Sequence, residues 1–214
     1  MTHKMNYFIT GIGTNVGKTI VAAVVVEALQ ADYWKPVQSG ELNYTDAQRV
    51  KNLITNNKSR FFEEVYKFTQ PLSPHVAAKI DGVEIDFDQF ILPPTENHLV
   101  VEGAGGLMVP LNENYLILDL IEKLQLNVIL VSKNYLGSIN HTLMTAEILK
   151  MRQIPVKGLI FSGVENPESE SYIAAYANLN ILGRIEYEEV MSKTFIKRNA
   201  DKLRPALLSQ KSNH

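Results

Sequence analysis

The sequence predicts an α/β fold: a single-domain, doubly wound, mostly parallel sheet with helices on both of its faces. Short apolar segments alternate with helix-like segments at least five times along the chain, as in parallel α/β proteins. Glycine or polar turns follow the apolar segments, at the strand ends where open parallel sheets bind ligands. The first apolar segment runs into a glycine-rich loop that opens a helix, which is how a right-handed crossover begins.

Local chemistry marks where the predicted elements begin and end. Pro36 belongs at a strand end because proline cannot donate to a ladder. Thr45 or Asp46 can cap the helix predicted over residues 47–54. Ser138 or Asn140 can cap the later helix that ends at Met151. Strands are predicted over residues 6–10, 33–37, 61–68, 98–101, 127–132, 156–161 and 181–185. Helices are predicted over residues 20–29, 47–54, 73–80, 86–92, 138–151 and 167–177.

The signals for these elements differ in strength. Aromatic and β-branched residues at 6–10 predict a buried strand, and residues 128–131 form the continuous apolar run that a strand covered on both faces requires. Residues 61–68 predict only a weak strand. Pro74 can start a short helix, because proline fits the first helical turn. Residues 186–214 mix a plausible helix with charge, and the last four of them are expected to fray.

Composition limits the class of protein. The 214 residues suit one α/β domain, residues 1–214, and are too few for two. A hydrophobic content of 45% and a net charge of −2 describe an ordinary globule without a nucleic-acid surface. Zero cysteines exclude disulfides, thiolate metal sites and cysteine nucleophiles. We find no signal peptide and no apolar segment of about 20 residues, so we expect a cytoplasmic enzyme or switch that does not bind membranes.

A phosphate-binding loop is the strongest motif in the chain. The first strand leads through Gly11 and Gly13 into Gly17-Lys18-Thr19, which open a helix. The backbone N–H groups of such a loop face an anion, with Lys18 at the β- and γ-phosphates and the Thr19 hydroxyl on Mg²⁺. Five residues separate Gly11 from Gly17 where the usual pattern has four, so the strand–loop–helix context decides the assignment. A dinucleotide fingerprint at Gly11 and Gly13 and a glycine turn without a ligand are the alternatives.

Charged residues lie at other predicted element ends. Lys35 lies where the second strand ends, at the ligand-binding edge of the sheet, although a solvated lysine is an equally good interpretation. Glu102 follows a strand and precedes the glycines of 103–106, as metal-holding carboxylates do in phosphate-loop enzymes. Asp46 is more simply a helix cap. Together these residues indicate a Mg²⁺-dependent enzyme that hydrolyses nucleotides or transfers phosphoryl groups.

The chain resembles the dethiobiotin synthetase family from Phe8 to about Gly183. Five separated blocks carry the resemblance in the family's order: residues 10–19, 35–40, 73–75, 101–106 and 137–141. The resemblance implies that 7,8-diaminononanoate and CO₂ form a carbamate, which attacks the γ-phosphate of ATP. The second amine then captures the carbamic-phosphoric anhydride and closes the ring, a step of biotin biosynthesis. Positive charge and in-line positioning suit an anionic nucleophile that approaches a triphosphate.

The resemblance also implies what individual residues do. The catalytic candidates are Lys35, Lys18 and Thr14, and the implied Mg²⁺ ligands are Thr19, Asp46 and Glu102. The implied nucleotide-binding residues are Gly13, Thr14, Asn15, Val16, Gly17, Lys18, Thr19, Ile20, Asp46, Glu102, Gly103, Ala104, Gly105, Ser162 and Gly163. The implied substrate-binding residues are Lys35, Ser39, Gly106, Ser138, Ile139 and Asn140. The last three begin a helix that the partner subunit of a homodimer contributes, where the helix start meets the substrate carboxylate.

Two departures from the family concern the nucleobase. Ser162-Gly163 stands where the family commonly has an asparagine that reads adenine, and a hydroxyl cannot make that two-point contact. Residues 183–187 lack the proline of a loop that covers the base, and the tail after them diverges from the family. We therefore expect ATP to bind mainly through its phosphates, so that other nucleoside triphosphates substitute for it. His75 and His141 match family blocks, and we interpret both as packing or capping residues.

Two rival classes also use this kind of fold. A partition-type or site-selecting switch ATPase has an additional lysine at the start of the phosphate loop, where this chain has Gly13, and no amphipathic carboxyl-terminal membrane helix is evident. An amide-forming cofactor synthetase usually adds a glutaminase domain, for whose nucleophile 214 residues without cysteine leave no room. Phosphate release separates the classes: a dethiobiotin synthetase needs diamine and bicarbonate together, whereas a switch hydrolyses ATP alone.

Overall fold

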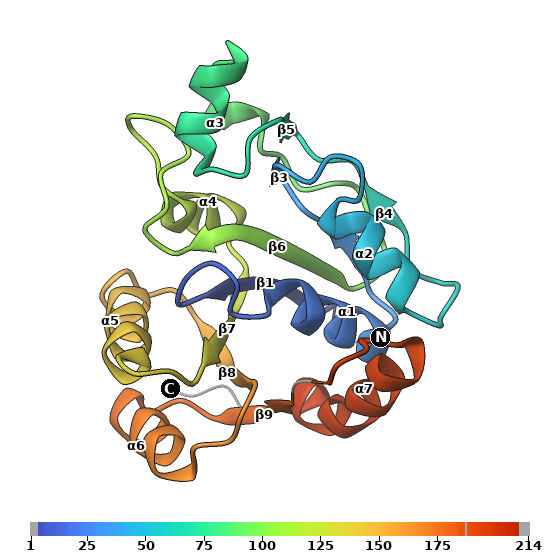
Figure 1. The fold of residues 1–214 in the computed structure, drawn as a ribbon, viewed down its shortest axis with the longest axis vertical. Coiled ribbons are helices and arrows are strands. Elements are labelled where there is room, and N and C mark those ends of the chain that lie inside the picture. The colour runs from blue at the N-terminus through green and yellow to red at the C-terminus, as the bar shows by residue number, and fades with distance from the viewer. Residues whose placement is uncertain (1–3, 187, 210–214) are drawn as a thin grey trace.

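The main sheet has seven strands in the order β4-β2-β6-β1-β7-β8-β9, and each neighbouring pair is parallel (Figure 1). The computed structural model describes residues 4–186 and 188–209. The strands are β1 (Asn6–Gly11), β2 (Asp32–Trp34), β4 (Phe61–Phe62), β6 (Leu99–Gly106), β7 (Asn127–Lys133), β8 (Val156–Ser162) and β9 (Ile181–Ile185). A second, two-stranded sheet pairs β3 (Val37–Ser39) with β5 (Tyr66–Phe68).

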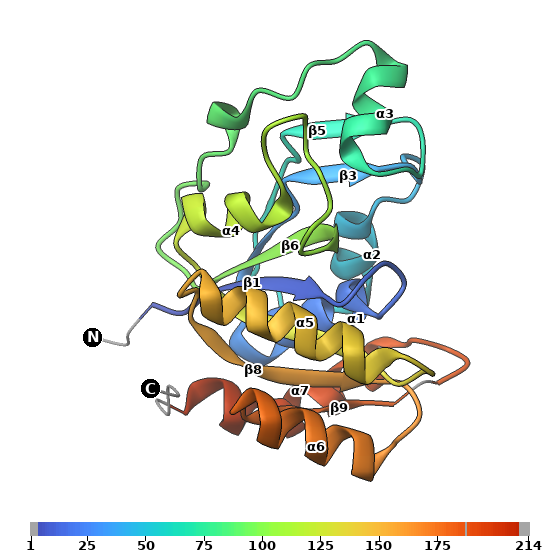
Figure 2. The same cartoon turned by 90° about the vertical axis from the view of Figure 1, so that its left-hand side faces the viewer.

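Helices cover both faces of the main sheet, and Figure 2 shows α5 in front of the strands with α1 behind them. One face is covered by α1 (Lys18–Leu29), α2 (Asp46–Leu53) and α7 (Lys193–Leu208). The other face is covered by α4 (Ile117–Leu124), α5 (Ser138–Met151) and α6 (Pro167–Ala177). Near β3 and β5, at the top of Figure 1, lie α3 (Pro74–Asp81) and a 3₁₀ turn (Phe87–Gln89).

The apolar residues of β1 serve two cores, one on each face. Tyr7 and Ile9 pack with α1 and α7, whereas Phe8 packs on the opposite side with residues of α4. Successive side chains of a strand point to opposite faces, so a continuous apolar strand is what a sheet covered twice needs. This architecture confirms the predicted fold class, a doubly wound parallel sheet with helices on both faces. The assignment of the whole chain to one domain stays a prediction.

The prediction of one strand over 33–37 is wrong, because β2 and β3 belong to different sheets. Pro36 has no N–H to continue the ladder, and its carbonyl oxygen instead accepts from the N–H of Val65 at 2.8 Å. The predicted strand over 61–68 divides in the same way, into β4 and β5. Lys35 therefore lies at the corner where the chain leaves the main sheet.

Three other segments differ from the prediction or complete it. The helix predicted over 86–92 is only the 3₁₀ turn Phe87–Gln89. The sequence analysis missed α4, which starts after Leu116, a residue without a capping oxygen. The charged tail forms α7, and its Phe195 is buried against the core that contains α1. The fraying predicted for residues 211–214 concerns residues outside those described.

Two glycine segments bring the phosphate loop against β6. Gly11 and Gly106 are register partners in β1 and β6. A side chain at Gly106 would lie 3.3 Å from the carbonyl oxygen of Gly11 and 3.4 Å from the backbone of Gly13, so glycine permits this close approach. The strand that carries Glu102 continues to Gly106, farther than predicted. The phosphate loop and Glu102 thus share the carboxyl edge of the sheet, where parallel sheets bind ligands.

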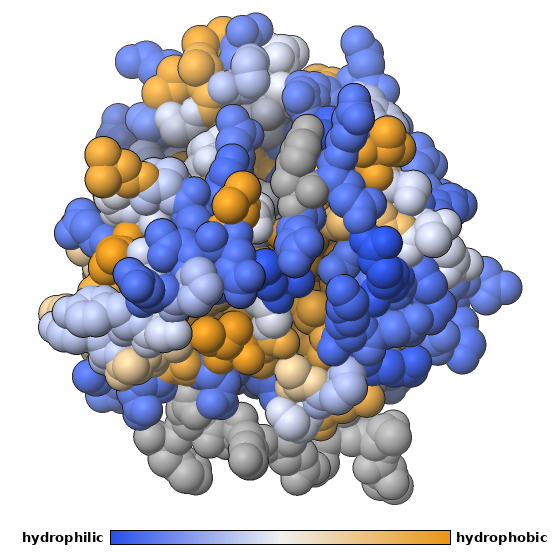
Figure 3. Space-filling view, turned by 60° about the horizontal axis from the view of Figure 1, so that its bottom comes forward, coloured by the Kyte–Doolittle hydropathy of each residue, from blue (hydrophilic) through white to orange (hydrophobic). Residues whose placement is uncertain are grey.

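The side of the molecule that faces down in Figure 1 is mostly hydrophilic, with small separate apolar patches (Figure 3). The exposed residues of α7 include Lys197, Arg198 and Lys202, which account for part of the charge of the tail. Among the described residues, no helix combines the length with the apolar character that a bilayer span requires.

Candidate functional site

A cleft of about 650 Å³ opens at the carboxyl edge of the main sheet. Its walls are the phosphate loop, the corner between β2 and β3, the start of α2 and the end of β6, and Pro71 to Pro74 also contribute. The residues predicted from the sequence that line it are Thr14, Asn15, Gly17, Lys18, Thr19, Ile20, Lys35, Ser39, Asp46, Glu102, Gly103, Ala104 and Gly105.

Lys18 folds back over the phosphate loop. Its ammonium donates to the carbonyl oxygen of Gly13 at 2.7 Å, and its side chain is buried. Burial lowers the pKa of Lys18 to about 8, with the carboxylate of Glu102 opposing the change and the charge of Lys35 adding to it. Gly17 caps α1 in a left-handed conformation with φ at +95°. The loop therefore places an ammonium group beside the amino terminus of a helix, a combination suited to anions.

Lys35 joins two carboxylates at the floor of the cleft. Its Nζ lies 2.8 Å from Asp46 Oδ2 and 3.1 Å from Glu102 Oε1. Lys35 is 4% exposed and Glu102 is 1% exposed, so the alternative of a solvated strand-end lysine is wrong. Burial by itself lowers the pKa of Lys35, but the two carboxylates outweigh burial and raise that pKa above its ordinary value. Lys35 is therefore held as a cation.

The Thr19 hydroxyl faces the same two carboxylates. Its Oγ1 lies 2.8 Å from Glu102 Oε1 and 3.1 Å from Asp46 Oδ1. Asp46 is available for this contact because Thr45 caps α2, in a capping box with Gln48. Burial raises the pKa of the Asp46 carboxyl, but the charge of Lys35 and hydrogen bonds bring it below its ordinary value. The bland interpretation of Asp46, as a helix cap, is therefore wrong.

Tyr33, Gln38 and Arg49 are among the residues of the site that the sequence analysis did not identify. The buried Tyr33 hydroxyl donates to Glu102 Oε2 at 2.8 Å, and Gln38 Oε1 accepts from the N–H of Asp46 at 3.2 Å. Arg49 lines the cleft, 3.2 Å from Glu41. Tyr33 and Gln38 flank Lys35 closely in sequence, and that proximity was the available signal. No sequence signal pointed to Arg49.

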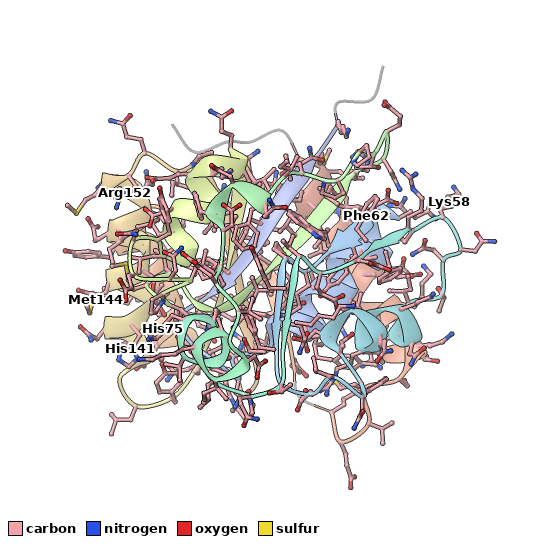
Figure 4. All side chains as sticks on the ribbon, turned by 90° about the horizontal axis from the view of Figure 1, so that it is seen from above. Lys58, Phe62, His75, His141, Met144 and Arg152 are labelled. Carbon is pink, nitrogen blue, oxygen red and sulfur yellow. The ribbon has the colours of Figure 1, made fainter. Side chains whose placement is uncertain are left out.

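Several predicted site residues lie outside the cleft. Gly13, Val16 and Gly106 do not line it: Gly106 lies against the backbone of Gly13, and Val16 is buried. The Ser162 hydroxyl donates to the carbonyl oxygen of Val16 at 2.7 Å, whereas Gly163 follows at the end of β8. Ser138, Ile139 and Asn140 begin α5. Figure 4 shows His141 and Met144 of this helix at one side of the molecule, opposite Phe62.

The two histidines of the family blocks lie apart from the charged cluster. His141 Nδ1 is 2.7 Å from the Tyr135 hydroxyl at the start of α5. His75 belongs to α3, and its N–H donates to the carbonyl oxygen of Pro110 at 3.4 Å. Both histidine side chains are exposed and neither lines the cleft (Figure 4).

Comparison with known proteins assigns the chain to a family. A family model described as an AAA domain matches residues 5–194. The ATP-dependent dethiobiotin synthetase of Christiangramia forsetii is 52% identical over 202 residues, which are 94% of this chain and 97% of that protein. The chain belongs to the ATP-dependent dethiobiotin synthetase family. The synthetase of Cytophaga hutchinsonii is 48% identical over 198 residues, 92% of this chain and 96% of that protein. The predicted family resemblance is thereby confirmed.

Solved structures extend the likeness of this synthetase family member to its fold. A ParA family ATPase from Chlorobium tepidum shares 12% identity at a TM-score of 0.58, over 96% of this chain and 98% of that one. A plasmid partition protein from Borrelia burgdorferi bound to AMPPNP shares 9% at a TM-score of 0.61, with the same coverage. At such identities the likeness shows the fold alone, so it lends no support to the rival interpretation as a partition-type switch.

Proposed function

We propose that this cleft performs the ATP-dependent carboxylation and ring closure of 7,8-diaminononanoate that yields dethiobiotin. Membership of the synthetase family supports the overall reaction. One observation supports its location: Lys18, Thr19, Lys35, Asp46 and Glu102, from four separate segments, meet in a single cleft. Burying two ammonium groups is costly unless anions face them. A carbamate and the γ-phosphate are the anions that this reaction supplies.

The triphosphate is assigned to the phosphate loop and the start of α1. Backbone N–H groups between Gly13 and Ile20 hold phosphate oxygens, and Lys18 exchanges the carbonyl of Gly13 for the β- and γ-phosphates. The Thr14 hydroxyl and the backbone from Glu102 to Gly105 lie on the same cleft and complete this set. The position of Lys18 supports this assignment, because its ammonium already contacts the loop through the carbonyl oxygen of Gly13.

Mg²⁺ fits the oxygens of Thr19, Asp46 and Glu102. Among the residues described, no group of three or more histidine, cysteine, aspartate or glutamate side chains could hold a metal. Mg²⁺ does not need such a group, since it keeps several waters and uses one or two carboxylates besides phosphate oxygens. When bound, it neutralises charge that develops on the phosphates. Lys35 bridges the same two carboxylates and compensates their charge.

Lys35 and Lys18 are assigned to the transferring phosphoryl group. The carbamate is a weak nucleophile, and both it and the γ-phosphate are anions that repel each other. Ammonium groups that flank the two reactants lower this repulsion. Lys35 is buried beside Ser39, which lines the same cleft and is assigned to the diamine together with Gly106. Ser39 Oγ is buried without a partner among the described residues, as expected of a hydroxyl that awaits a substrate amine.

We assign the substrate carboxylate to the start of α5 in a second subunit. Ser138, Ile139 and Asn140 lie outside the cleft of their own chain, so they can act only if another copy brings them there. A helix amino terminus suits a carboxylate. The proposal therefore includes a homodimer with two equivalent shared sites.

Product analysis tests the reaction. Purified protein is incubated with diamine, bicarbonate, Mg²⁺ and ATP, and dethiobiotin is measured by mass spectrometry alongside phosphate. We expect both products only when diamine and bicarbonate are present together. Phosphate release at the full rate without diamine would contradict the proposal and favour a switch ATPase.

Subunit complementation tests the shared site. Lys35→Gln and Asn140→Asp each damage a different half of the same site, so each homodimer should be nearly inactive. Mixing the two variants after dissociation should restore up to about a quarter of the wild-type rate, because half of the dimers are hybrids with one intact site of two. A mixture as inactive as its parents would contradict the shared site.

A further inference from the structure

Ser162 ends β8 and touches the phosphate loop from behind. Its Oγ donates to the carbonyl oxygen of Val16 at 2.7 Å. A Cβ placed on Gly17 would lie 3.1 Å from the same Oγ, so strand end and loop are in direct contact. Gly17 lines the cleft, whereas Ser162 does not. The serine therefore acts on the loop from the side opposite the ligand space.

The contact orients one peptide group of the loop. In a trans peptide the C=O of one residue and the N–H of the next point in opposite directions, and no cis bond occurs among the described residues. Holding the Val16 carbonyl against Ser162 therefore turns the Gly17 N–H away from the serine, toward the cleft. Gly17 adopts φ of +95°, and glycine reorients at little steric cost, so this peptide needs an external partner to stay in place.

We propose that Ser162 is a positioning residue for triphosphate binding, which fixes the Gly17 N–H by bonding the Val16 carbonyl. The inference rests on the proposed binding of triphosphate at the loop. A hydroxyl has one proton to donate, and here Val16 receives it. Ser162 therefore supports the phosphates of any nucleoside triphosphate equally and leaves the base unread. This role differs from that of the asparagine which, by the family resemblance, reads adenine at this position.

Binding of inorganic tripolyphosphate with Mg²⁺ isolates this role from any base. Affinities are measured by calorimetry for tripolyphosphate, ATP, GTP and CTP. We expect Ser162→Ala to weaken all four by the same factor, roughly 3- to 10-fold, since a neutral hydrogen bond is lost. Ser162→Thr keeps the hydroxyl and should restore most of the affinity. Unchanged tripolyphosphate affinity in Ser162→Ala, or a loss confined to ATP, would overturn the inference.

Ser132 provides a matched control on the neighbouring strand. It is buried near the end of β7, 2.8 Å from the Thr142 hydroxyl, and Lys133 beside it is the register partner of Ser162. Ser132→Ala should lower the melting temperature and leave tripolyphosphate affinity unchanged. An equal loss of affinity in this control would overturn the inference, because any loosening of the sheet edge would then suffice. If the wild type binds no triphosphate, the proposed function fails together with it.

Discussion

The two ends of β2 both bury charge, in opposite ways. At the amino end, Asp32 is fully buried and accepts hydrogen bonds from the Arg60 N–H at 2.8 Å and the Thr95 hydroxyl at 2.7 Å. Asn97 adds a further bond at 3.2 Å, and the Arg60 guanidinium pairs with the carboxylate. Each partner is part of the protein, and none of these residues lines the cleft at the carboxyl edge of the sheet. This end is closed.

The carboxyl end of β2 is open. Lys35 and Glu102 are nearly as deeply buried as Asp32, and Asp46 is partly buried, but all three line a cleft of about 650 Å³. Two lysines and two carboxylates neutralise one another there in the absence of a ligand. A charged ligand that enters the cleft can replace some of these contacts with its own. The comparison teaches that burial and pairing are not enough to identify a site. What identifies it is a paired cluster with room for another charged group.

Lys35→Gln, at the carboxyl end of β2, is expected to have the largest effect on turnover. Its loss should reduce turnover roughly 100- to 1,000-fold, in the range for removal of one preorganised electrostatic contact, while ATP still binds. Rates of dethiobiotin formation and ATP affinity, measured together, provide the check. Lys18→Gln is the matched control, since it should weaken both triphosphate binding and rate. Near-normal turnover in Lys35→Gln would remove it from the catalytic residues.

Asp32→Asn should affect stability and not activity. The substitution keeps the shape and removes a charge that accepts several bonds, which should cost roughly 2–3 kcal/mol of unfolding free energy. Urea unfolding should show a lower midpoint with an unchanged slope, and kcat/KM should stay within about twofold. A loss of activity at full stability would show that the closed end of β2 communicates with the cleft.

The same carboxylate gives a pH dependence with a defined sign. Burial raises the pKa of Asp32, but hydrogen bonds led by Thr95 outweigh burial and lower it below the ordinary value. A lowered folded-state pKa contributes stability that is present above the unfolded pKa of about 3.9 and is lost as pH falls through the folded value. Wild type should therefore lose stability below about pH 4 more steeply than Asp32→Asn. Parallel unfolding curves from pH 5 to 3 would contradict this.

Tyr33 gives a smaller effect, because it lies within β2 and faces the open end. Tyr33→Phe removes the hydrogen bond to Glu102 Oε2 and leaves the carboxylate less well oriented. Loss of a partner behind a metal ligand typically costs about tenfold or more in metal affinity. We expect the Mg²⁺ concentration for half-maximal rate to rise by about that factor, with kcat at saturating Mg²⁺ little changed. An unchanged Mg²⁺ requirement would argue against Glu102 as a ligand.

The fold and the charged end of β2 were accessible from the sequence for a physical reason. Parallel sheets place their ligand sites at the carboxyl ends of their strands. A motif such as Gly17-Lys18-Thr19 therefore indicates which edge of the sheet holds the site, and polar residues at the ends of the other strands are expected near it. Glu102 was predicted from its place at a strand end before glycines, whereas Asp46 could be assigned only through the family resemblance, since an acidic residue near a helix start is usually a cap. Their contacts with Thr19 and Lys35 come from long-range packing.

Other features were inaccessible because they depend on tertiary contacts. The chain passes from the main sheet to the second sheet at Pro36. Local strand propensity does not show which sheet a strand joins. The Tyr33 contact with Glu102 joins residues 69 positions apart. The hydrogen bond from the Ser162 hydroxyl to the carbonyl oxygen of Val16, 146 positions away, was equally inaccessible.

The smallest effect concerns the nucleobase. If the open end of β2 and the phosphate loop supply most of the binding energy, replacing ATP by GTP or CTP should change kcat/KM by less than about tenfold, or about 1.4 kcal/mol. The Ser162 hydroxyl donates its one hydrogen bond to the carbonyl oxygen of Val16, so it cannot also make a two-point contact with adenine. Steady-state rates with the three triphosphates test this directly. A larger preference for ATP would mean that a base-reading group acts alongside the charged cluster, and the contrast between the ends of β2 would then explain only part of nucleotide recognition.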